Sequence, residues 1–170
     1  MGKNLLALQE SSDYPCIFVQ SGLSMKVCQH NGLSVVLLTG KQEHCPPHVH
    51  VKHEKWDATF KFSFLHDAVE SWALDTKKVV PSKALLEAIR QTIEEPANVQ
   101  ACRKAWWDTH GARLKLCLTN RYWDPIKEDE VDGKNATQGM PQILSASYDP
   151  IKQVTKLTFG GGTTPVEIQL

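Results

Sequence analysis

The apolar and polar positions near the start of the chain predict an antiparallel β-hairpin. Two runs rich in valine and leucine, at residues 25–29 and 33–39, flank the tripeptide 30–32, which reads His-Asn-Gly. Asn-Gly between two apolar runs is the strongest short signal for a tight hairpin turn. We therefore expect these two runs to pair as neighbouring strands.

A second hairpin is predicted between residues 48 and 64. Residues 48–53 alternate, so that Val49 and Val51 point to one side of a strand and the polar residues between them point to the other. A turn at 54–56 then leads into a returning strand with apolar residues at every second position, namely Ala58, Phe60, Phe62 and Phe64. The two hairpins together predict a small antiparallel sheet.

Two helices are predicted after the hairpins. Ser82 can cap the first helix, whose apolar residues recur at helical spacing between Leu85 and Ile93. Pro96 suits the first position of a second helix, and its apolar stripe is predicted to end at Gly111. We expect both helices to pack on one face of the sheet, since an amphipathic helix must bury its apolar stripe.

The last third of the chain divides into a polar stretch and a set of strands. Residues 119–139 contain few apolar residues and are predicted to form a linker. Residues 140–170 predict a three-stranded meander of about 30 residues, which is too small to be stable alone and must pack on something else. The expected fold is therefore α+β: a sheet of hairpins with two packed helices over 16–118, then the linker, then the β-meander.

Charge and composition exclude several classes of protein. The 170 residues include 19 Lys+Arg and 19 Asp+Glu, so the net charge is zero and no overall positive field gathers nucleic acid or an anionic bilayer. Lysines are nevertheless concentrated in the first third of the chain. A local basic patch, acting with an exposed tryptophan, keeps sequence-specific nucleic acid binding open as a weaker possibility.

The cysteines and the hydropathy predict a cytoplasmic protein. The five cysteines are odd in number and widely spaced, and they include no Cys-x-x-Cys pair. The N-terminus lacks the apolar core of a signal peptide, and no run of about 18 apolar residues could span a membrane. We therefore expect a reducing compartment, free thiols and no membrane partner.

The densest chemical feature is the segment 43–53, which holds four of the seven histidines and one thiol. His48 and His50 are expected on the same side of a strand, about 7 Å apart, where they could share one metal ion or one phosphate. The rigid Pro-Pro step before them would let His44 or Cys45 fold back. Because imidazole and thiolate suit zinc, the predicted ligands of a divalent metal such as zinc are His44, Cys45, His48 and His50.

Other readings of these residues remain open. A His-x-His pair on a strand can also be an ordinary polar face, or a hydrogen-bonding pair that holds a loop. Lys52 could contact a phosphate, and a hydrolytic site would need a carboxylate, for which Glu43, Asp57 and Asp67 are available. In the Trp106-Trp107 pair, one ring must enter the core, and the other could anchor a partner. The candidate binding residues are His48, His50, Lys52 and Trp107.

The motif Pro46-Pro47-His48-Val49-His50-Val51 resembles the core of a small bacterial family catalogued as domain of unknown function 4160. The resemblance covers about 32–107 and implies a hairpin, a loop ending in the motif, a returning strand and two helices. The tail over 140–170, which reads Met-Pro-Gln-Ile-Leu-Ser at 140–145 and Leu-Thr-Phe-Gly-Gly-Gly at 157–162, is similar to a second family, domain of unknown function 2442. Genes of the two families are often neighbours, so this chain resembles a fusion of such a pair. Neither family brings an established reaction.

Two functions are therefore expected, and they belong to different classes. The first is a small cytosolic protein of a prokaryote or phage that binds a protein partner or a second copy of itself. The family context makes it similar to toxin–antitoxin or phage-defence regulators, and we expect it not to be an enzyme. The alternative is a metal-dependent hydrolase or nuclease that uses the histidines of 44–53. Stoichiometric metal in the purified protein would separate the two.

Overall fold

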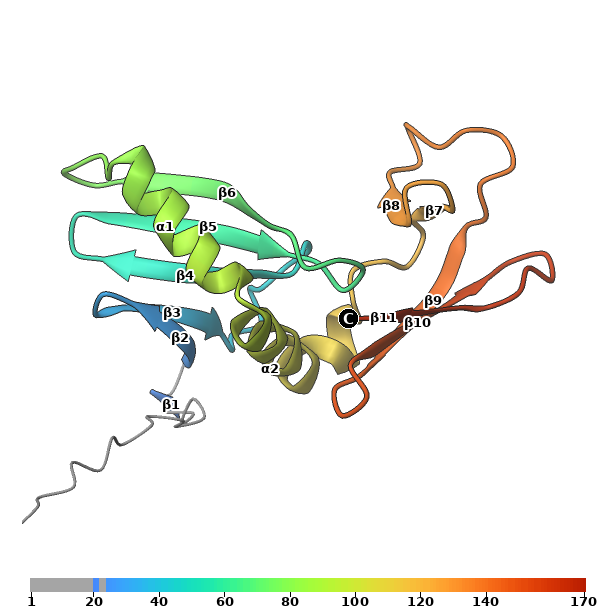
Figure 1. The fold of residues 1–170 in the computed structure, drawn as a ribbon, viewed down its shortest axis with the longest axis horizontal. Coiled ribbons are helices and arrows are strands. Elements are labelled where there is room, and N and C mark those ends of the chain that lie inside the picture. The colour runs from blue at the N-terminus through green and yellow to red at the C-terminus, as the bar shows by residue number, and fades with distance from the viewer. Residues whose placement is uncertain (1–19, 22–23) are drawn as a thin grey trace, which may run out of the picture.

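The computed structural model describes residues 20–21 and 24–170, and within them it shows an α+β fold in two parts (Figure 1). The first part contains an antiparallel sheet whose strands follow one another in chain order, and the second part contains a three-stranded antiparallel sheet. The expected fold class is confirmed. The strands of the first sheet are β1 (Gln20–Ser21), β2 (Ser24–His30), β3 (Leu33–Leu38), β4 (His48–His53), β5 (Trp56–Phe62) and β6 (Val69–Thr76).

Both predicted hairpins are present. In the turn between β2 and β3, Asn31 and Gly32 have φ values of 46° and 82°, and residues that tolerate this left-handed region are what a tight hairpin turn requires. Strand β4 pairs with β5 from His48 opposite Lys61 to His53 opposite Trp56. Val49 and Val51 are fully buried, as their alternation predicts. His48 and His50 alternate with these valines along β4, so the two histidines share one side of the strand.

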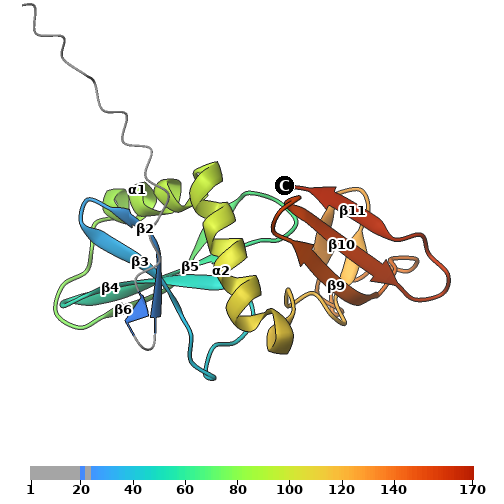
Figure 2. The same ribbon diagram turned by 90° about the horizontal axis from the view of Figure 1, so that it is seen from below.

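Helices α1 (Lys83–Glu94) and α2 (Pro96–Leu114) lie on one face of the sheet, as Figures 1 and 2 both show. The hydroxyl of Ser82 accepts a hydrogen bond from the backbone N–H of Leu85 at 3.1 Å, which confirms the predicted cap. Gly111, however, does not end α2. A Cβ at this position would come within 2.7 Å of the Trp107 ring, so this glycine permits a close approach within the helix instead.

Strand β6 is an outer strand that the sequence pattern did not predict. It pairs with β5 on one side, and the sheet has no further described strand beyond it. Only Val69 is buried among its eight residues, whereas Trp72 and Leu74 are each 40% exposed. Since an amphipathic strand is recognised by one buried face, a strand that leaves nearly every side chain exposed carries no such signal.

The polar stretch that was predicted as a linker contains a two-stranded ribbon, formed by β7 (Tyr122–Asp124) and β8 (Asp129–Val131). Trp123 is 5% exposed and packs into the hydrophobic core. Arg121 pairs with carboxylates that follow in the same segment. The segment therefore has local structure of its own between the sheet and the meander.

The C-terminal meander consists of β9 (Ile143–Asp149), β10 (Val154–Phe159) and β11 (Val166–Gln169), with β10 in the centre. It meets the first part through side chains: the ring of Tyr148 lies 5.0 Å from that of Phe64, and the side-chain amide of Gln100 bonds to that of Gln153. The meander was expected to need a surface to cover it, and the first part of the same chain supplies one.

The prediction of free thiols is corrected for two cysteines, because Cys45 and Cys117 form a disulfide across 72 residues. Cys28 and Cys102 are buried in the core outside this bond, and Cys16 lies outside the described residues. No helix within the described residues is long and apolar enough to cross a membrane.

Candidate metal centre

Three side chains with metal-ligating atoms converge where the loop before β4 meets that strand. His48 and His50 stand two residues apart on β4, and their ring centroids are 4.8 Å apart. Glu43 reaches them from the loop that joins β3 to β4. One ligand atom from each of the three residues lies within 4.8 Å of the others. Two imidazoles and one carboxylate form a ligand set that zinc and other first-row metals accept.

The centre is largely removed from solvent. The side chains of His48 and Glu43 are only 2% and 4% exposed, and that of His50 is 18% exposed. The ring of His48 also lies 5.0 Å from Trp72 of β6 and 6.0 Å from Trp106 of α2, measured between centroids. Charges in such surroundings need a partner, because their hydration is lost on burial.

The geometry of His48 determines which of its nitrogens carries a proton. Its Nδ1 lies 2.8 Å from the backbone oxygen of Pro46, and since a carbonyl oxygen can only accept, Nδ1 must be the donor. The neutral ring then presents the lone pair of Nε2 to Oε2 of Glu43, 3.0 Å away. Two acceptors at that distance repel each other unless a cation lies between them. Either a proton or a metal ion can serve as that cation.

The carboxyl group of Glu43 is adapted to remain charged. Burial acts to raise its pKa, but hydrogen bonds from the rings of His48 and His50, together with the positive charge of these rings when they carry a proton, outweigh burial and lower the pKa to about 2. Oε2 of Glu43 and Nε2 of His50 are buried and have no well-aligned hydrogen bond to any described residue. Unpartnered polar atoms at this depth are costly, and coordination of one ion would satisfy both.

The separations are close to those around a bound ion. Two ligands at the usual 2.0–2.1 Å from a tetrahedral zinc lie about 3.3 Å from each other. Nε2 of His48 and Nε2 of His50 are 3.0 and 3.6 Å from the two oxygens of Glu43. Taken as one atom from each residue, the three ligand atoms lie within 4.8 Å of one another, so the side chains would close further on a bound ion. The hydrogen bond from His48 to Pro46 is the type of outer-sphere contact that orients a metal-bound imidazole.

The backbone at Glu43 is held by neighbouring elements. Its N–H donates to the oxygen of Gly40 at 3.3 Å, and its own carbonyl oxygen accepts from Nη2 of Arg113, near the end of α2, at 2.9 Å. Cys45, two residues further, is tied to Cys117 just beyond the same helix. The carboxylate is therefore positioned by α2 and its C-terminal extension as well as by the loop.

The structure brings together only some of the predicted metal ligands. His48 and His50 are adjacent, as predicted, and Glu43 is the one of the three available carboxylates that joins them. His44 lies beside the centre, with its ring 5.4 Å from that of His48, but outside the group of three. The assignment of Cys45 as a ligand is corrected, because its sulfur is bonded to Cys117 and offers no thiolate.

The other candidate residues lie apart from this centre. Lys52 is exposed near the far end of β4, and Trp107 is half-buried against Gly111. Asp57 pairs with Lys77, and Asp67 pairs with the buried Arg103. Sequence reasoning missed Trp72, whose ring contacts both His44 and His48. The only local signal was an aromatic residue in a stretch of mixed polarity, which specifies no site.

Comparison with known proteins adds no relative to this picture. No family model matches the chain, and no curated protein or solved structure matches it either. The resemblance to the two bacterial families therefore stays a prediction, and the function has to be argued from the chain's own residues.

Proposed function

We propose that this protein binds one divalent first-row transition metal, with zinc as the first choice, through Glu43, His48 and His50. The observation that carries the proposal is the contact between Nε2 of His48 and the Glu43 carboxylate at 3.0 Å in a nearly solvent-free position. Nδ1 of the same ring already donates its proton to Pro46. A metal ion between the two acceptors relieves their repulsion and also satisfies the unpartnered nitrogen of His50.

The burial of the centre favours a metal that orders the loop before β4 over one that activates water. A hydrolytic metal keeps a coordination position open to water and substrate. Here only His50, at 18%, has an appreciably exposed side chain among the three ligands. The ion would join the loop to β4, in addition to the contacts of Arg113 and Cys45. A metal-dependent hydrolase or nuclease is the less favoured proposal for the same residues.

Zinc titration of the full-length protein tests the proposal directly. Protein made without a polyhistidine tag and kept oxidised is expected to take up one zinc ion in isothermal titration calorimetry. His50→Gln should weaken the zinc affinity by about 100-fold or more. Loss of an outer-sphere partner alone costs up to about 100-fold, and loss of a direct ligand should cost at least as much. The matched control is His53→Gln on the same strand. The ring of His53 stacks on that of Trp56, with 5.1 Å between the ring centroids, and does not belong to the metal centre.

Two results would contradict the metal proposal. One is the absence of saturable zinc binding to the wild-type protein, with manganese and nickel giving the same outcome. The other is an equal loss of affinity in His50→Gln and His53→Gln, which would place the bound ion on surface histidines in general. Turnover of a phosphodiester substrate by the zinc-loaded protein, abolished by His50→Gln, would instead support the hydrolytic alternative.

A second proposed function, binding of a protein partner, is supported by the outer strand β6. No described strand lies beside its outer edge, and Trp72 and Leu74 are each 40% exposed. Only Val69, at the start of the strand, has its backbone N–H and carbonyl oxygen bonded to side chains of α1. An open edge with apolar side chains is a template for an added strand. We propose that a second copy of the chain is the partner that pairs there. Regulation of the toxin–antitoxin or phage-defence type is the setting that the resemblance to the two bacterial families implies, and the cytoplasm is the compartment that the sequence predicts.

Pairing at β6 is expected to give a dimer that a charge on the edge disrupts. Leu74→Lys should shift the protein to a monomer in multi-angle light scattering, because lysine on an edge strand opposes further pairing. Ile151→Lys is the control, since Ile151 is 92% exposed in the turn between β9 and β10 and should leave the dimer intact. A wild-type protein that stays monomeric at every concentration would overturn this proposal.

A further inference from the structure

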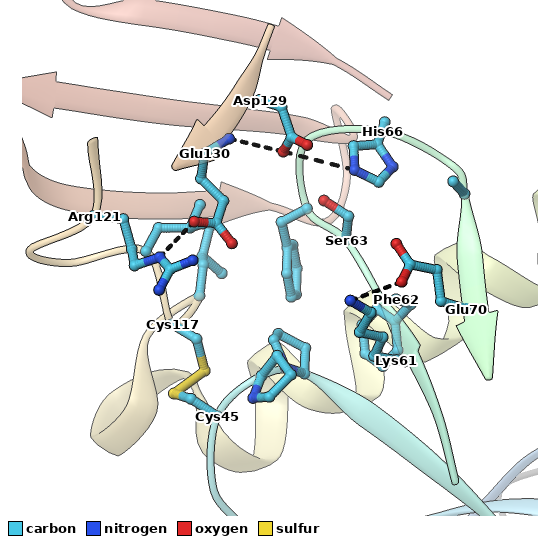
Figure 3. A pocket seen from close by; sticks show the side chains of 16 residues that line it. Cys45, Lys61, Phe62, Ser63, His66, Glu70, Cys117, Arg121, Asp129 and Glu130 are labelled. Carbon is cyan, nitrogen blue, oxygen red and sulfur yellow. Dashed lines mark hydrogen bonds and ion pairs between the residues drawn. A yellow bond between two sulfur atoms is a disulfide. The ribbon is translucent and has the colours of Figure 1, made fainter. Parts of the chain in front are cut away.

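The Cys45–Cys117 disulfide stands in the wall of a pocket that is separate from the metal ligands. The pocket has a volume of about 360 Å³ and extends from the loop before β4 to Arg121 and β8 (Figure 3). Cys45 is exposed and Cys117 is half-buried. Figure 3 shows the two sulfurs at one side of the pocket, with Arg121 and Lys61 on other sides. A small molecule that enters the pocket can therefore reach the S–S bond.

Two cationic side chains of the pocket are paired with carboxylates of the same pocket and not directed at the disulfide. Lys61 pairs with Glu70 at 2.7 Å, and Arg121 pairs with Glu130. Next to the disulfide, the wall is formed by prolines and leucines, namely Pro46, Pro47, Leu116 and Leu118. The volume lies at the lower end of the range for small-molecule sites. It suits a peptide-sized thiol better than a protein thiol on a folded surface.

The disulfide is also a covalent anchor of the loop that carries Glu43. Cys45 is two residues from this metal ligand, and the loop between β3 and β4 has no strand or helix of its own. Two hydrogen bonds from α2 also hold this region: Arg113 donates to the carbonyl oxygen of Glu43, and His110 donates to that of Leu38 at the end of β3. Once the S–S bond is open, Arg113 is the side chain of α2 that still bonds to the loop near Glu43.

We propose that the Cys45–Cys117 disulfide is a thiol-exchange site for a low-molecular-weight thiol, and that its opening weakens the metal centre. The second half of this inference rests on the proposed function of metal binding. An accessible disulfide is more readily exchanged than a buried structural one. In a reducing compartment, which the sequence predicts, protein disulfides are usually transient or redox-sensing. The metal affinity of the protein would then report the thiol status of its surroundings.

The exchange needs two equivalents of thiol. The thiolate of the first attacks Sγ of Cys45, a new S–S bond forms, and Cys117 leaves as a thiolate that takes a proton from water. A second thiolate attacks the outer sulfur of this mixed disulfide. The products are the small-molecule disulfide and a second protein thiol at Cys45. The protein disulfide is thereby reduced by two electrons, and two small thiols are oxidised to one disulfide.

Zinc affinity and thiol release together test the proposal. Oxidised full-length protein is treated with glutathione under anaerobic conditions, freed of glutathione, and titrated with zinc. We expect it to bind zinc about tenfold more weakly than the untreated protein, the lower range for loss of an outer-sphere support. Cys45→Ser/Cys117→Ser should show the same weakening without any thiol, and glutathione should not change it further. Mass spectrometry should find the glutathionyl adduct on Cys45 as the intermediate.

The disulfide's role in holding the loop that carries Glu43 is called the clamp below, and a single variant separates it from a competing role of Cys45. In Cys117→Ser the thiol of Cys45 is free beside the centre, and we expect its zinc affinity to equal that of the double variant. Tighter binding by Cys117→Ser or by the reduced wild type would mean that Cys45 becomes a ligand, and it would overturn the clamp. Circular dichroism of the reduced wild type checks that its fold is retained if the serine variants fold poorly.

The failures of the two proposals are distinguishable. Equal zinc affinity in the oxidised, reduced and double-variant proteins would overturn the clamp while metal binding stands. No zinc binding by the oxidised wild type would overturn the metal centre and its regulation together. Glutathione that leaves the disulfide intact in the folded protein, as measured by alkylation of released thiols, would overturn the exchange site whatever the metal result.

Discussion

Replacement of Arg103 by methionine is expected to lower the free energy of unfolding by about 3–5 kcal/mol, the usual cost of breaking a buried charged network from one side. Arg103 in α2 is fully buried. Its Nε donates to the carbonyl oxygen of Ser63 and its Nη2 to that of His66, both at 2.8 Å. Methionine retains much of the volume but no donor, so both carbonyl oxygens lose a charged partner. Urea denaturation followed by circular dichroism measures the loss.

The control for this prediction is the carboxylate on the same guanidinium group. Asp67 lies 2.9 Å from Nη2 of Arg103, but its side chain is 57% exposed. Asp67→Asn should therefore cost less than about 1 kcal/mol, because water already solvates the charge. A loss of similar size in Arg103→Met and Asp67→Asn would show that the ion pair, and not the two backbone carbonyls, makes Arg103 important.

The location of Arg103 connects this stability to the arrangement of the two parts. The backbone carbonyls that it binds belong to the turn after β5, and Phe64 of that turn contacts Tyr148 of the meander. Fixing the turn fixes the surface on which the meander rests. We therefore expect faster amide exchange in β9 in Arg103→Met than in Asp67→Asn.

The elements that could be predicted are those with local signals. Asn31-Gly32 specifies its turn because both residues accept a left-handed backbone, and Ser82 specifies a helix start because its hydroxyl meets a free N–H. Strand β6 carries no comparable signal, since only Val69 of the strand is buried. Gly111 misled the prediction, because the pattern of a helix-ending glycine is the same as that of a glycine beneath a neighbouring ring.

The candidate site shows the same division. Alternation along β4 was sufficient to predict that His48 and His50 lie together, because a strand repeats every two residues. The choice of Glu43 over His44 as the third group depends on how the loop turns toward β4, and α2 sets that turn through Arg113. The bond between Cys45 and Cys117 spans 72 residues and joins segments that only the tertiary fold brings together.

Acidification of the metal-free protein is expected to remove about 3 kcal/mol of stability through Glu43 alone. The pKa of this carboxyl group falls from 4.5 to about 2 in the folded chain, since the rings of His48 and His50 outweigh the effect of burial. Between these values the unfolded state binds more protons than the folded state, so stability increases with pH. The contribution is complete above the unfolded pKa of 4.5 and is lost as the pH falls toward 2.

Glu43→Gln isolates this contribution, because glutamine has a similar shape and does not titrate in this range. Urea denaturation of both proteins, with a chelator present, should give a difference in unfolding free energy that grows as the pH rises from about 2 to 5 and then levels off. A difference that does not depend on pH would mean that Glu43 keeps an ordinary pKa and that no cation holds it to His48. A chelator is needed because protons and zinc compete for the same ligand atoms. With zinc bound, the unfolding free energy of the wild-type protein should stay constant down to a lower pH than it does without zinc. Addition of zinc should change the pH dependence of Glu43→Gln much less.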